Sequence, residues 1–497
     1  MVNDNLFALF RSRYPRDLAA RFLEGPGGRV VDYAAVETES ARLAGTLASL
    51  GARPGDRIAV QVEKSPEAVL LYLACLRAGF VFLPLNTAYL PDEVDYFLSD
   101  SEPAVVVCSP GREPQGSAVG GARVVTLAAD GSGSLADRAR ESEPAPEVVE
   151  RGSGDPAAIL YTSGTTGRSK GAVLSHGNLA ANGLALHRAW GFEPSDVLLH
   201  VLPVYHAHGL FVALHTTLLN GGGALFMPSF EPAQVCEALP RASVMMGVPT
   251  HYVRLLGYAG FDAECCRTMR LFVSGSAPLL GETFEAFRTR TGHTILERYG
   301  MTETGMNTSN PLVGDRIAGS VGPPLEGVEV RVCDDAGTPL ATGEIGGLEV
   351  RGPNVFREYW RMPDKTRSEF RAGGWFMTGD LARIDERGYV HLVGRAKDLI
   401  ISGGLNVYPK EVEAVLDDCP GVVETAVFGL PDPDFGEAVT AAVVAEAPGA
   451  VVEADVIAHA RARLAAFKAP KRVVLVDALP RNAMGKVQKN RLRDAHA

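Results

Sequence analysis

A segment rich in glycine and hydroxyl side chains, between positions 161 and 171, has the residue types that bind phosphate. It reads YTSGTTGRSKG and follows the apolar run 157–160, which predicts a strand. Glycines let several backbone N–H groups converge on one anion, and hydroxyls and a lysine add further donors. The residues that we assign to phosphate binding are Thr162, Ser163, Gly164, Thr165, Thr166, Gly167 and Lys170.

The spacing within this segment excludes an ordinary P-loop. A P-loop places its lysine directly after the last glycine, whereas Lys170 stands three residues after Gly167. A P-loop ATPase or kinase is therefore disfavoured. Taken alone, the segment is also compatible with a flexible surface turn, but its hydroxyl density and its lysine favour a polyphosphate site.

Several further motifs follow in order along the chain. They are SGSAP at 274–278, YGMTE at 299–303, TGD at 378–380, GRAKD at 394–398 with Gly403 and Gly404, and NAMGK at 482–486. Together with the phosphate segment, they resemble the signatures of the adenylate-forming superfamily. That superfamily contains acyl-CoA synthetases, beetle luciferases and the adenylation domains of peptide synthetases. One such motif is weak, but the ordered set covers most of the chain.

The resemblance implies that ATP, Mg²⁺ and coenzyme A are used. Adenylate formation attacks the α-phosphorus of ATP with a carboxylate, so charge on phosphorus and on the leaving pyrophosphate must be neutralised. We expect Glu303 to hold Mg²⁺, Thr302 to donate to the α-phosphate, and Lys486 to bridge carboxylate and phosphate as the catalytic lysine. The nearby Lys489, Arg491 and Arg493 are interpreted as solubilising charges.

The resemblance also assigns the remaining nucleotide contacts. We expect Asp380 to accept from the ribose hydroxyls, Arg395 to close on the same sugar, and Tyr299 to stack on adenine. The full set of predicted ATP and AMP contacts beyond the phosphate segment is Ser274, Gly275, Ser276, Ala277, Pro278, Tyr299, Gly300, Thr302, Asp380 and Arg395.

Thioester-forming members of the superfamily run two steps with a domain rotation between them. Acyl-AMP forms first, and the CoA thiol then displaces AMP. Lys397 matches the hinge position of the resemblance. Gly403 and Gly404 are predicted to line the CoA channel, because a glycine presents no side chain to a passing pantetheine. That these glycines are turn residues remains the alternative.

Two arginines indicate the substrate. Arg298 directly precedes Tyr299, and Arg254 lies one turn past position 250. A buried guanidinium favours a carboxylate partner, so a substrate with a second carboxylate, a small dicarboxylate, is expected. The residues predicted to contact that carboxylate are Arg298, Arg254, His206, Ser276 and Met301. A salt bridge from Arg298 to Glu297 or Glu303 is the alternative.

The sequence around this pocket resembles malonyl-CoA synthetases. The segments are VYHAHGLF, GVPTHYVR, ERYGMTE and MNTSNP. The resemblance implies ATP-dependent ligation of malonate to coenzyme A through malonyl-AMP, with methylmalonate open as a further substrate because one methyl group discriminates weakly. The alternatives are another small-carboxylate acyl-CoA synthetase, an amino-acid-activating enzyme, a luciferase-like oxygenase and a nucleotide sensor. A sensor disagrees with the presence of Lys486 and Glu303.

The elements that position these motifs predict an α/β fold. Strands at 56–62, 81–85 and 104–108 alternate with helices over 66–78 and 91–98, the pattern of a covered parallel sheet. Residues 109–155 are interpreted as a loose connection with one strand at 123–127. The α/β alternation continues to about 310, and 315–393 predicts a small β-rich unit. The last unit follows Gly394 and Arg395 and has its own helix over 409–416.

We therefore expect an N-terminal domain over 1–394, made of two α/β subdomains and a small β-rich subdomain. A mobile α+β C-terminal domain over 395–497 carries Lys486.

Composition narrows the possible partners. The chain has 497 residues, with 48 basic and 59 acidic side chains and a net charge of −11. This balance argues against nucleic-acid and anionic-membrane binding. We expect no membrane span, secretory signal or targeting address, hence a cytoplasmic protein. Its seven cysteines, without a CxxC pair, are expected to be reduced thiols.

Overall fold

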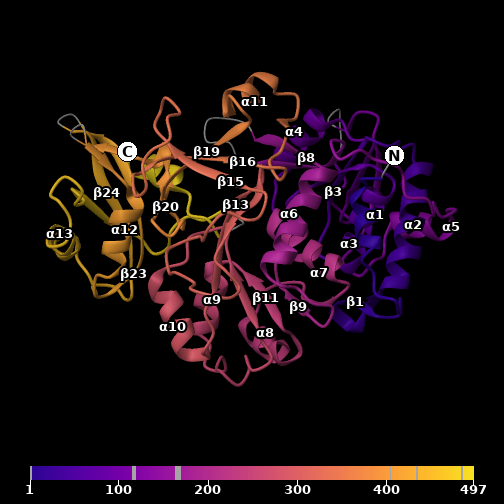
Figure 1. The fold of residues 1–497 in the computed structure, drawn as a ribbon, viewed down its shortest axis with the longest axis horizontal. Coiled ribbons are helices and arrows are strands. Elements are labelled where there is room, and N and C mark those ends of the chain that lie inside the picture. Colours follow the sequence, from indigo (N-terminus) through magenta and orange to yellow (C-terminus); the bar gives the residue numbers. More distant parts are fainter. Residues whose placement is uncertain (1–2, 115–118, 163–168, 403–404, 433–434, 483–484) are drawn as a thin grey trace.

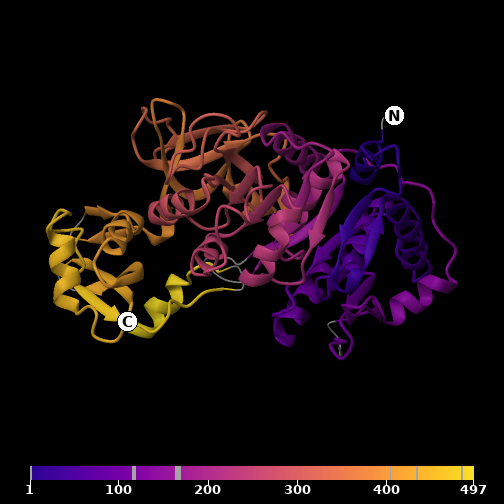
Figure 2. The same cartoon turned by 90° about the horizontal axis from the view of Figure 1, so that it is seen from below.

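The computed structural model describes residues 3–114, 119–162, 169–402, 405–432, 435–482 and 485–497. Its strands form four sheets, and the C-terminal residues make a separate body at the end of the molecule opposite the N-terminus (Figures 1 and 2). This arrangement confirms the predicted α/β class, with a large N-terminal part and a smaller C-terminal part.

The first sheet carries the strands on either side of the phosphate segment. In spatial order it contains β17 (Glu358–Tyr359), β8 (Lys170–Ser175), β7 (Pro156–Thr162), β4 (Val81–Pro84), β3 (Arg57–Gln61), β5 (Val105–Cys108) and β6 (Arg123–Thr126). The strands from β7 to β6 are parallel, and β8 turns back antiparallel to β7. The phosphate segment therefore joins two paired strands.

Helices cover this sheet. The main ones are α2 (Tyr33–Ser49), α3 (Pro66–Arg77), α4 (Pro91–Ser101) and α6 (His176–Ala189). The start of α3 follows directly from the sequence, because the side chain of Ser65 accepts a hydrogen bond from the backbone of Ala68 and Pro66 occupies the first turn. Nearly every residue of α3 is buried, so this helix lies in the core rather than at the surface.

The second sheet brings the substrate and adenine motifs together. Its spatial order is β14 (Gly305–Ser309), β13 (Leu296–Met301), β12 (Leu271–Ser274), β11 (Val244–Gly247), β9 (Val197–His200), β10 (Gly223–Phe226), β1 (Arg21–Glu24) and β2 (Val30–Asp32). Neighbours from β13 to β1 are parallel. Their carboxyl ends meet at one edge, where ligands bind in sheets of this kind. Helices α8 (Pro232–Ala238), α9 (Pro249–Leu256) and α10 (Gly281–Thr291) accompany this sheet.

Two smaller sheets complete the chain. The third contains β15 (Glu329–Cys333), β16 (Gly346–Arg351), β18 (Phe370–Arg371), β19 (Trp375–Ile384) and β20 (Val390–Arg395). The fourth contains β21 (Ile400–Ser402), β22 (Leu405–Val407), β23 (Val422–Asp432), β24 (Gly436–Ala445) and β25 (Arg472–Leu475), with helices α12 (Pro409–Asp417), α13 (Glu453–Arg461) and α14 (Lys489–His496). Arg395 thus ends the last strand of the third sheet.

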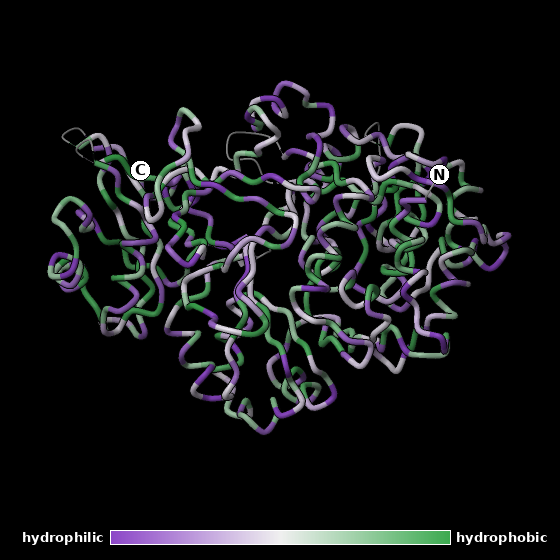
Figure 3. The backbone as a smooth tube through the Cα atoms, viewed as in Figure 1, coloured by the Kyte–Doolittle hydropathy of each residue, from purple (hydrophilic) through white to green (hydrophobic). Residues whose placement is uncertain are grey.

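Each body has its own apolar core, and hydrophobic stretches run along the strands and helices of each (Figure 3). The C-terminal core contains Val412, Leu416, Val427 and Val443. All seven cysteines are free thiols, as predicted. Among the described residues, no helix has the length and apolar character needed to cross a membrane.

The structure corrects one expectation about the connection over 109–155. Besides β6, it contains a helix, α5 (Ser134–Glu141), which packs on α2. Only Leu135 and Ala139 of this helix are buried, and the rest is strongly charged. Because two apolar side chains four residues apart are a weak periodic signal, tertiary packing rather than local sequence establishes this helix.

Candidate active site

The ends of β12 and β13 and the middle of β19 bring three motifs together. Ser274 is paired in register with Glu297 on the neighbouring strand. Tyr299 donates a hydrogen bond from its hydroxyl to Oδ2 of Asp380, at 2.5 Å. Residues separated by about a hundred positions in sequence thus lie together in the fold.

A preformed ion pair occupies the predicted ribose site. Nε of Arg395 lies 2.8 Å from Oδ1 of Asp380, and these two residues are directly opposite each other on β19 and β20. The backbone N–H of Asp380 is held by the hydroxyl of Thr378 at 3.1 Å. Burial, followed by the charge of Asp380, raises the pKa of Tyr299 well above its usual value. The structure brings together all three residues predicted for ribose and adenine.

Glu303 is held at the base of the site. It is buried, and its Oε1 accepts from the hydroxyls of Tyr359 at 3.0 Å and Thr162 at 3.4 Å. Lys170 lies nearby, with Nζ 4.4 Å from the centre of the Tyr359 ring, and burial lowers its pKa. The described residues contain no group of three or more side chains able to cage a metal. One carboxylate beside a phosphate segment fits Mg²⁺, which is commonly held by one or two carboxylates and the substrate phosphates.

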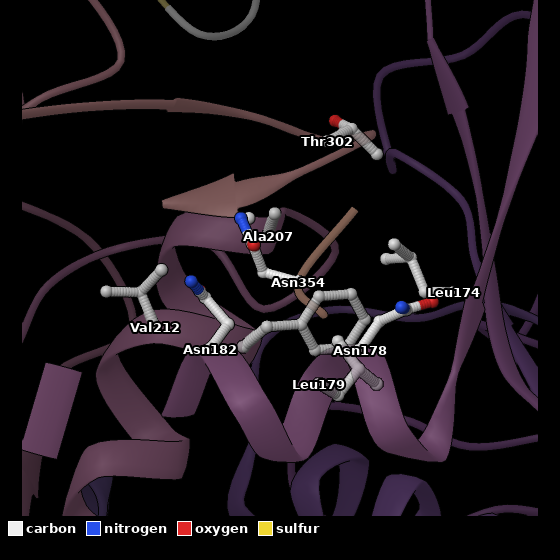
Figure 4. A pocket seen from close by; sticks show the side chains of 10 residues that line it. Leu174, Asn178, Leu179, Asn182, Ala207, Val212, Thr302 and Asn354 are labelled. Atoms are coloured by element: carbon white, nitrogen blue, oxygen red, sulfur yellow. The ribbon is translucent and has the colours of Figure 1, made fainter. Parts of the chain in front are cut away.

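Two buried asparagines hydrogen-bond the backbone that follows Thr302 and Glu303, and Figure 4 shows Asn182 and Asn354 in the pocket that Thr302 also lines. Asn182 on α6 donates to the carbonyl of Met306 at 2.8 Å and accepts from its N–H at 3.1 Å. Asn354 donates to the carbonyl of Thr304 at 2.7 Å. Sequence analysis missed both asparagines, because nothing in their local sequence marks a contact with a turn more than 45 residues away.

Arg298 is the most unusual charge in the site. Its side chain is 3% exposed, and its Nε and Nη2 have no hydrogen-bonding partner among the described residues. Burial lowers its pKa to about 9. Gly275 makes room for it, because a Cβ at that position would lie 2.4 Å from Cζ of Arg298. A buried, unpaired guanidinium is costly and calls for an anionic ligand.

The alternative partner Glu297 faces away from Arg298. Consecutive residues of a strand point to opposite faces of the sheet. Oε1 of Glu297 accepts instead from the backbone N–H of Leu279 at 3.2 Å, and Oε2 has no partner among the described residues. Burial raises the pKa of Glu297 to about 7. The structure therefore leaves Arg298 available for a ligand.

Two histidines surround Arg298. His208 is buried, with Nδ1 3.2 Å from the hydroxyl of Ser276 and Nε2 without a partner in the described part of the chain. Burial, followed by the charge of Arg298, lowers the pKa of His206 to about 4. Both rings are thus neutral near pH 7, and Arg298 supplies the positive charge. Met301, at the end of β13, is half-buried beside the same wall.

Arg254 does not share this pocket. Its side chain is 51% exposed, and its Nη2 lies 3.6 Å from Oε2 of Glu231. Tyr252 and Leu255 are the buried residues of α9, so the helix turns Arg254 outwards. The expectation that Arg254 helps to bind the substrate carboxylate is wrong in this structure. Sequence spacing did not establish which face of so short a helix is buried.

Lys486 lies at the nucleotide site. The loop that carries it is closed by hydrogen bonds between Asn482 and the backbone of Lys486, at 2.9 and 3.0 Å. Gly485 faces Thr250 of α9, and the yellow C-terminal segment extends towards the N-terminal domain (Figure 2). The side chain remains accessible to solvent, but surrounding protein partly desolvates it. That desolvation, followed by the charge of Arg395, lowers the pKa of Lys486, while Asp380 opposes the change.

The structure places some of the remaining predicted residues and does not describe the others. Lys397 lies in the single turn Ala396–Asp398 directly after β20, and partial burial lowers its pKa. Gly300 packs against the backbone of Gly305. Ala277 and Pro278 lie on the loop after β12. The predictions for Ser163, Gly164, Thr165, Thr166, Gly167, Gly403 and Gly404 fall outside the described residues.

The interpretation of Lys489 and Arg493 as solubilising charges is wrong, because both side chains form ion pairs within the protein. Nζ of Lys489 lies 2.5 Å from Oε1 of Glu413, and Nη2 of Arg493 lies 3.0 Å from Oδ1 of Asp398. Their spacing of four residues places both on one face of α14, which packs on the C-terminal domain. Arg491, between them, is exposed as expected.

Comparison with known proteins identifies the family of the chain. Residues 8–360 match the profile of the AMP-binding enzyme family, and 411–486 match its C-terminal domain. The chain belongs to the AMP-binding enzyme family. Among curated members, it is 37% identical to a malonate–CoA ligase of Mus musculus over 490 residues, covering 89% of this chain and 82% of that protein. It is also 37% identical to a feruloyl-CoA synthase of an Amycolatopsis species over 475 residues, covering 94% of each.

Solved AMP-binding enzymes share the whole fold. ATP-bound MatB from Rhodopseudomonas palustris is 54% identical, with a TM-score of 0.98 and coverage of 100% of this chain and 99% of that one. For apo MatB, at the same identity and coverage, the TM-score is 0.86. The chain therefore superposes more closely on the ATP-bound structure than on the apo structure.

The unpaired charge of Arg298 predicts an unusual stability effect. Because burial lowers its pKa to about 9, Arg298 is still charged at pH 7.5, and the cost of burying that charge destabilises the folded state in full at every pH below about 9. Arg298→Met should therefore raise the free energy of unfolding by about 1–3 kcal/mol at pH 7.5 without carboxylates, measured by denaturant titration.

Arg316→Met is the matched control. Arg316 is also partly buried, but its guanidinium donates to three backbone carbonyls, of Pro311, Thr294 and Leu312. Its replacement should lower the free energy of unfolding. A fall of similar size in both variants would contradict the assignment of Arg298 as an uncompensated charge.

Proposed function

We propose that this enzyme ligates malonate to coenzyme A through malonyl-AMP, releasing AMP and pyrophosphate. The buried, unpaired guanidinium of Arg298 is the observation that carries the proposal. The two 37% relatives do not by themselves select the acid, because one is a malonate–CoA ligase and the other a feruloyl-CoA synthase. A guanidinium in an apolar environment favours a carboxylate and disfavours a neutral ring or chain.

In the adenylation step, one malonate carboxylate attacks the α-phosphorus of ATP while the other binds Arg298. The bond from phosphorus to pyrophosphate breaks. Thr302 donates to the α-phosphate, and the ammonium of Lys486 bridges the attacking oxygen and the phosphate, so its charge acts most strongly in the transition state. Glu303 would hold Mg²⁺, which would supply positive charge against the phosphates. Asp380 and Arg395 fix the ribose.

Malonate fits the polar groups beside Arg298. The hydroxyl of Ser276 and the neutral rings of His206 and His208 supply further hydrogen bonds to the distal carboxylate. Methylmalonate adds only a methyl group, so we propose it as a weaker or comparable second substrate. An amino-acid substrate is disfavoured because Arg298 would repel its ammonium group.

In the second step, the thiol of coenzyme A attacks the acyl carbonyl of malonyl-AMP, and AMP leaves. We propose that residues 395–497 rotate about Lys397 relative to residues 1–394 between the steps. This rotation removes Lys486 from the site and brings Gly403 and Gly404 to the thiol channel. We place the enzyme in the cytoplasm, which agrees with its free thiols.

A panel of carboxylates tests the choice of acid. In ATP–pyrophosphate exchange, kcat/KM for malonate should exceed that for acetate, ferulate, benzoate and amino acids by at least about tenfold, because each charge-assisted hydrogen bond contributes roughly 1.5–3 kcal/mol. Arg298→Ala should lose this preference and retain some acetate turnover. Arg254→Ala, an exposed control, should behave as wild type; equal turnover of malonate and acetate by the wild-type enzyme would refute the proposal.

The role of Lys486 predicts a split between the two half-reactions. Lys486→Ala should reduce malonate-dependent exchange by about a hundredfold or more, since it removes a charge that stabilises the transition state. Thioester formation from supplied malonyl-AMP and coenzyme A should change by less than about threefold. A comparable loss in both half-reactions would show that Lys486 acts elsewhere.

A further inference from the structure

The last helix of the chain ties the catalytic loop to the hinge. Helix α14 begins three residues after Lys486, and Leu492 anchors it in an apolar cluster with Phe428, Leu430 and Leu479. This anchoring fixes the helix on the C-terminal sheet. The position of its ionic face then determines where the preceding loop lies.

Arg493 joins this helix to the hinge segment. Its Nη2 lies 3.0 Å from Oδ1 of Asp398, the last residue of the turn that contains Lys397. The two side chains are 30% and 18% exposed, so solvent screens their interaction only in part. Lys489, one turn earlier on the same face, is paired separately with Glu413.

The ion pair completes a continuous path through the site. Asp380 holds Arg395, and the turn after Arg395 ends at Asp398, which holds Arg493. Helix α14 then connects back to Lys486. The charges of Arg395, Asp380 and Asp398 all act on the pKa of Lys486, so the two ends of this path lie close together. The ribose pair and the catalytic lysine are thereby linked by one series of contacts across the hinge.

We propose that Arg493 is a positioning residue for the adenylation step, which fixes α14 and the loop of Lys486 against the hinge through its ion pair with Asp398. Arg493 has no part in binding substrate. It acts on the placement of the ammonium of Lys486, and a displacement of about 1 Å of such a group costs up to a hundredfold in rate. The inference rests on the proposed two-step function but does not depend on which acid is activated.

The test compares Arg493→Gln with Arg491→Gln in the full-length enzyme. Arg491 lies on the same helix, is exposed, and has the same charge. Arg493→Gln should lower kcat for ATP–pyrophosphate exchange about tenfold, with KM for ATP within about twofold, because nucleotide contacts are untouched. Thioester formation from supplied malonyl-AMP should stay within about twofold, and Arg491→Gln should match wild type in both assays.

Two further variants separate positioning from general stability. Arg493→Lys, which can still reach Asp398, should recover part of the exchange rate. Asp398→Asn should lower exchange as Arg493→Gln does, and the double variant should be no worse than either single one. Unchanged exchange, equal loss in both half-reactions, or additive losses would each overturn the proposal. The assay uses the carboxylate that the wild-type enzyme activates fastest. The test of Arg493 therefore still applies if malonate proves not to be the substrate.

Discussion

A buried positive charge that the protein does not neutralise is the constraint on which the substrate site depends. Arg298 lies on β13 with two of its nitrogens unpartnered, while the nearest carboxylate in sequence, Glu297, points to the other face of the sheet. The neighbouring histidines are neutral because the same burial and the same arginine lower their pKa values. The pocket is therefore electrostatically complete only when an anion occupies it.

In the nucleotide part of the site, by contrast, the charged side chains are paired within the protein. Asp380 is already engaged by Arg395 and Tyr299, and Glu303 by Tyr359. These pairs orient the side chains that are expected to contact ATP. One site thus combines a nucleotide part whose charges are paired within the protein with an acid-binding part whose guanidinium is unpaired among the described residues.

Sequence motifs were sufficient for the fold class and the family, because their order along the chain resembles that of the family and the strands and helices between them alternate as in a covered parallel sheet. Arg298 was also found, since it occupies a position directly before Tyr299. Arg254 was misplaced because the phase of α9 is set by the packing of Tyr252 and Leu255. Asn182, Asn354 and Arg493 make contacts across long sequence separations, which residue types and spacing do not encode.

Gly275 has a consequence for changing the acid that is activated. The guanidinium of Arg298 lies against its bare Cα, closer than any side chain would permit. A small residue in place of the arginine would open a hole floored by main chain, deep enough to admit a longer neutral tail. Any larger residue at 275 would instead displace the arginine. A change of the acid that this ligase activates therefore involves positions 275 and 298 together. The residue at 275 limits how deep the cavity left by replacing Arg298 can be.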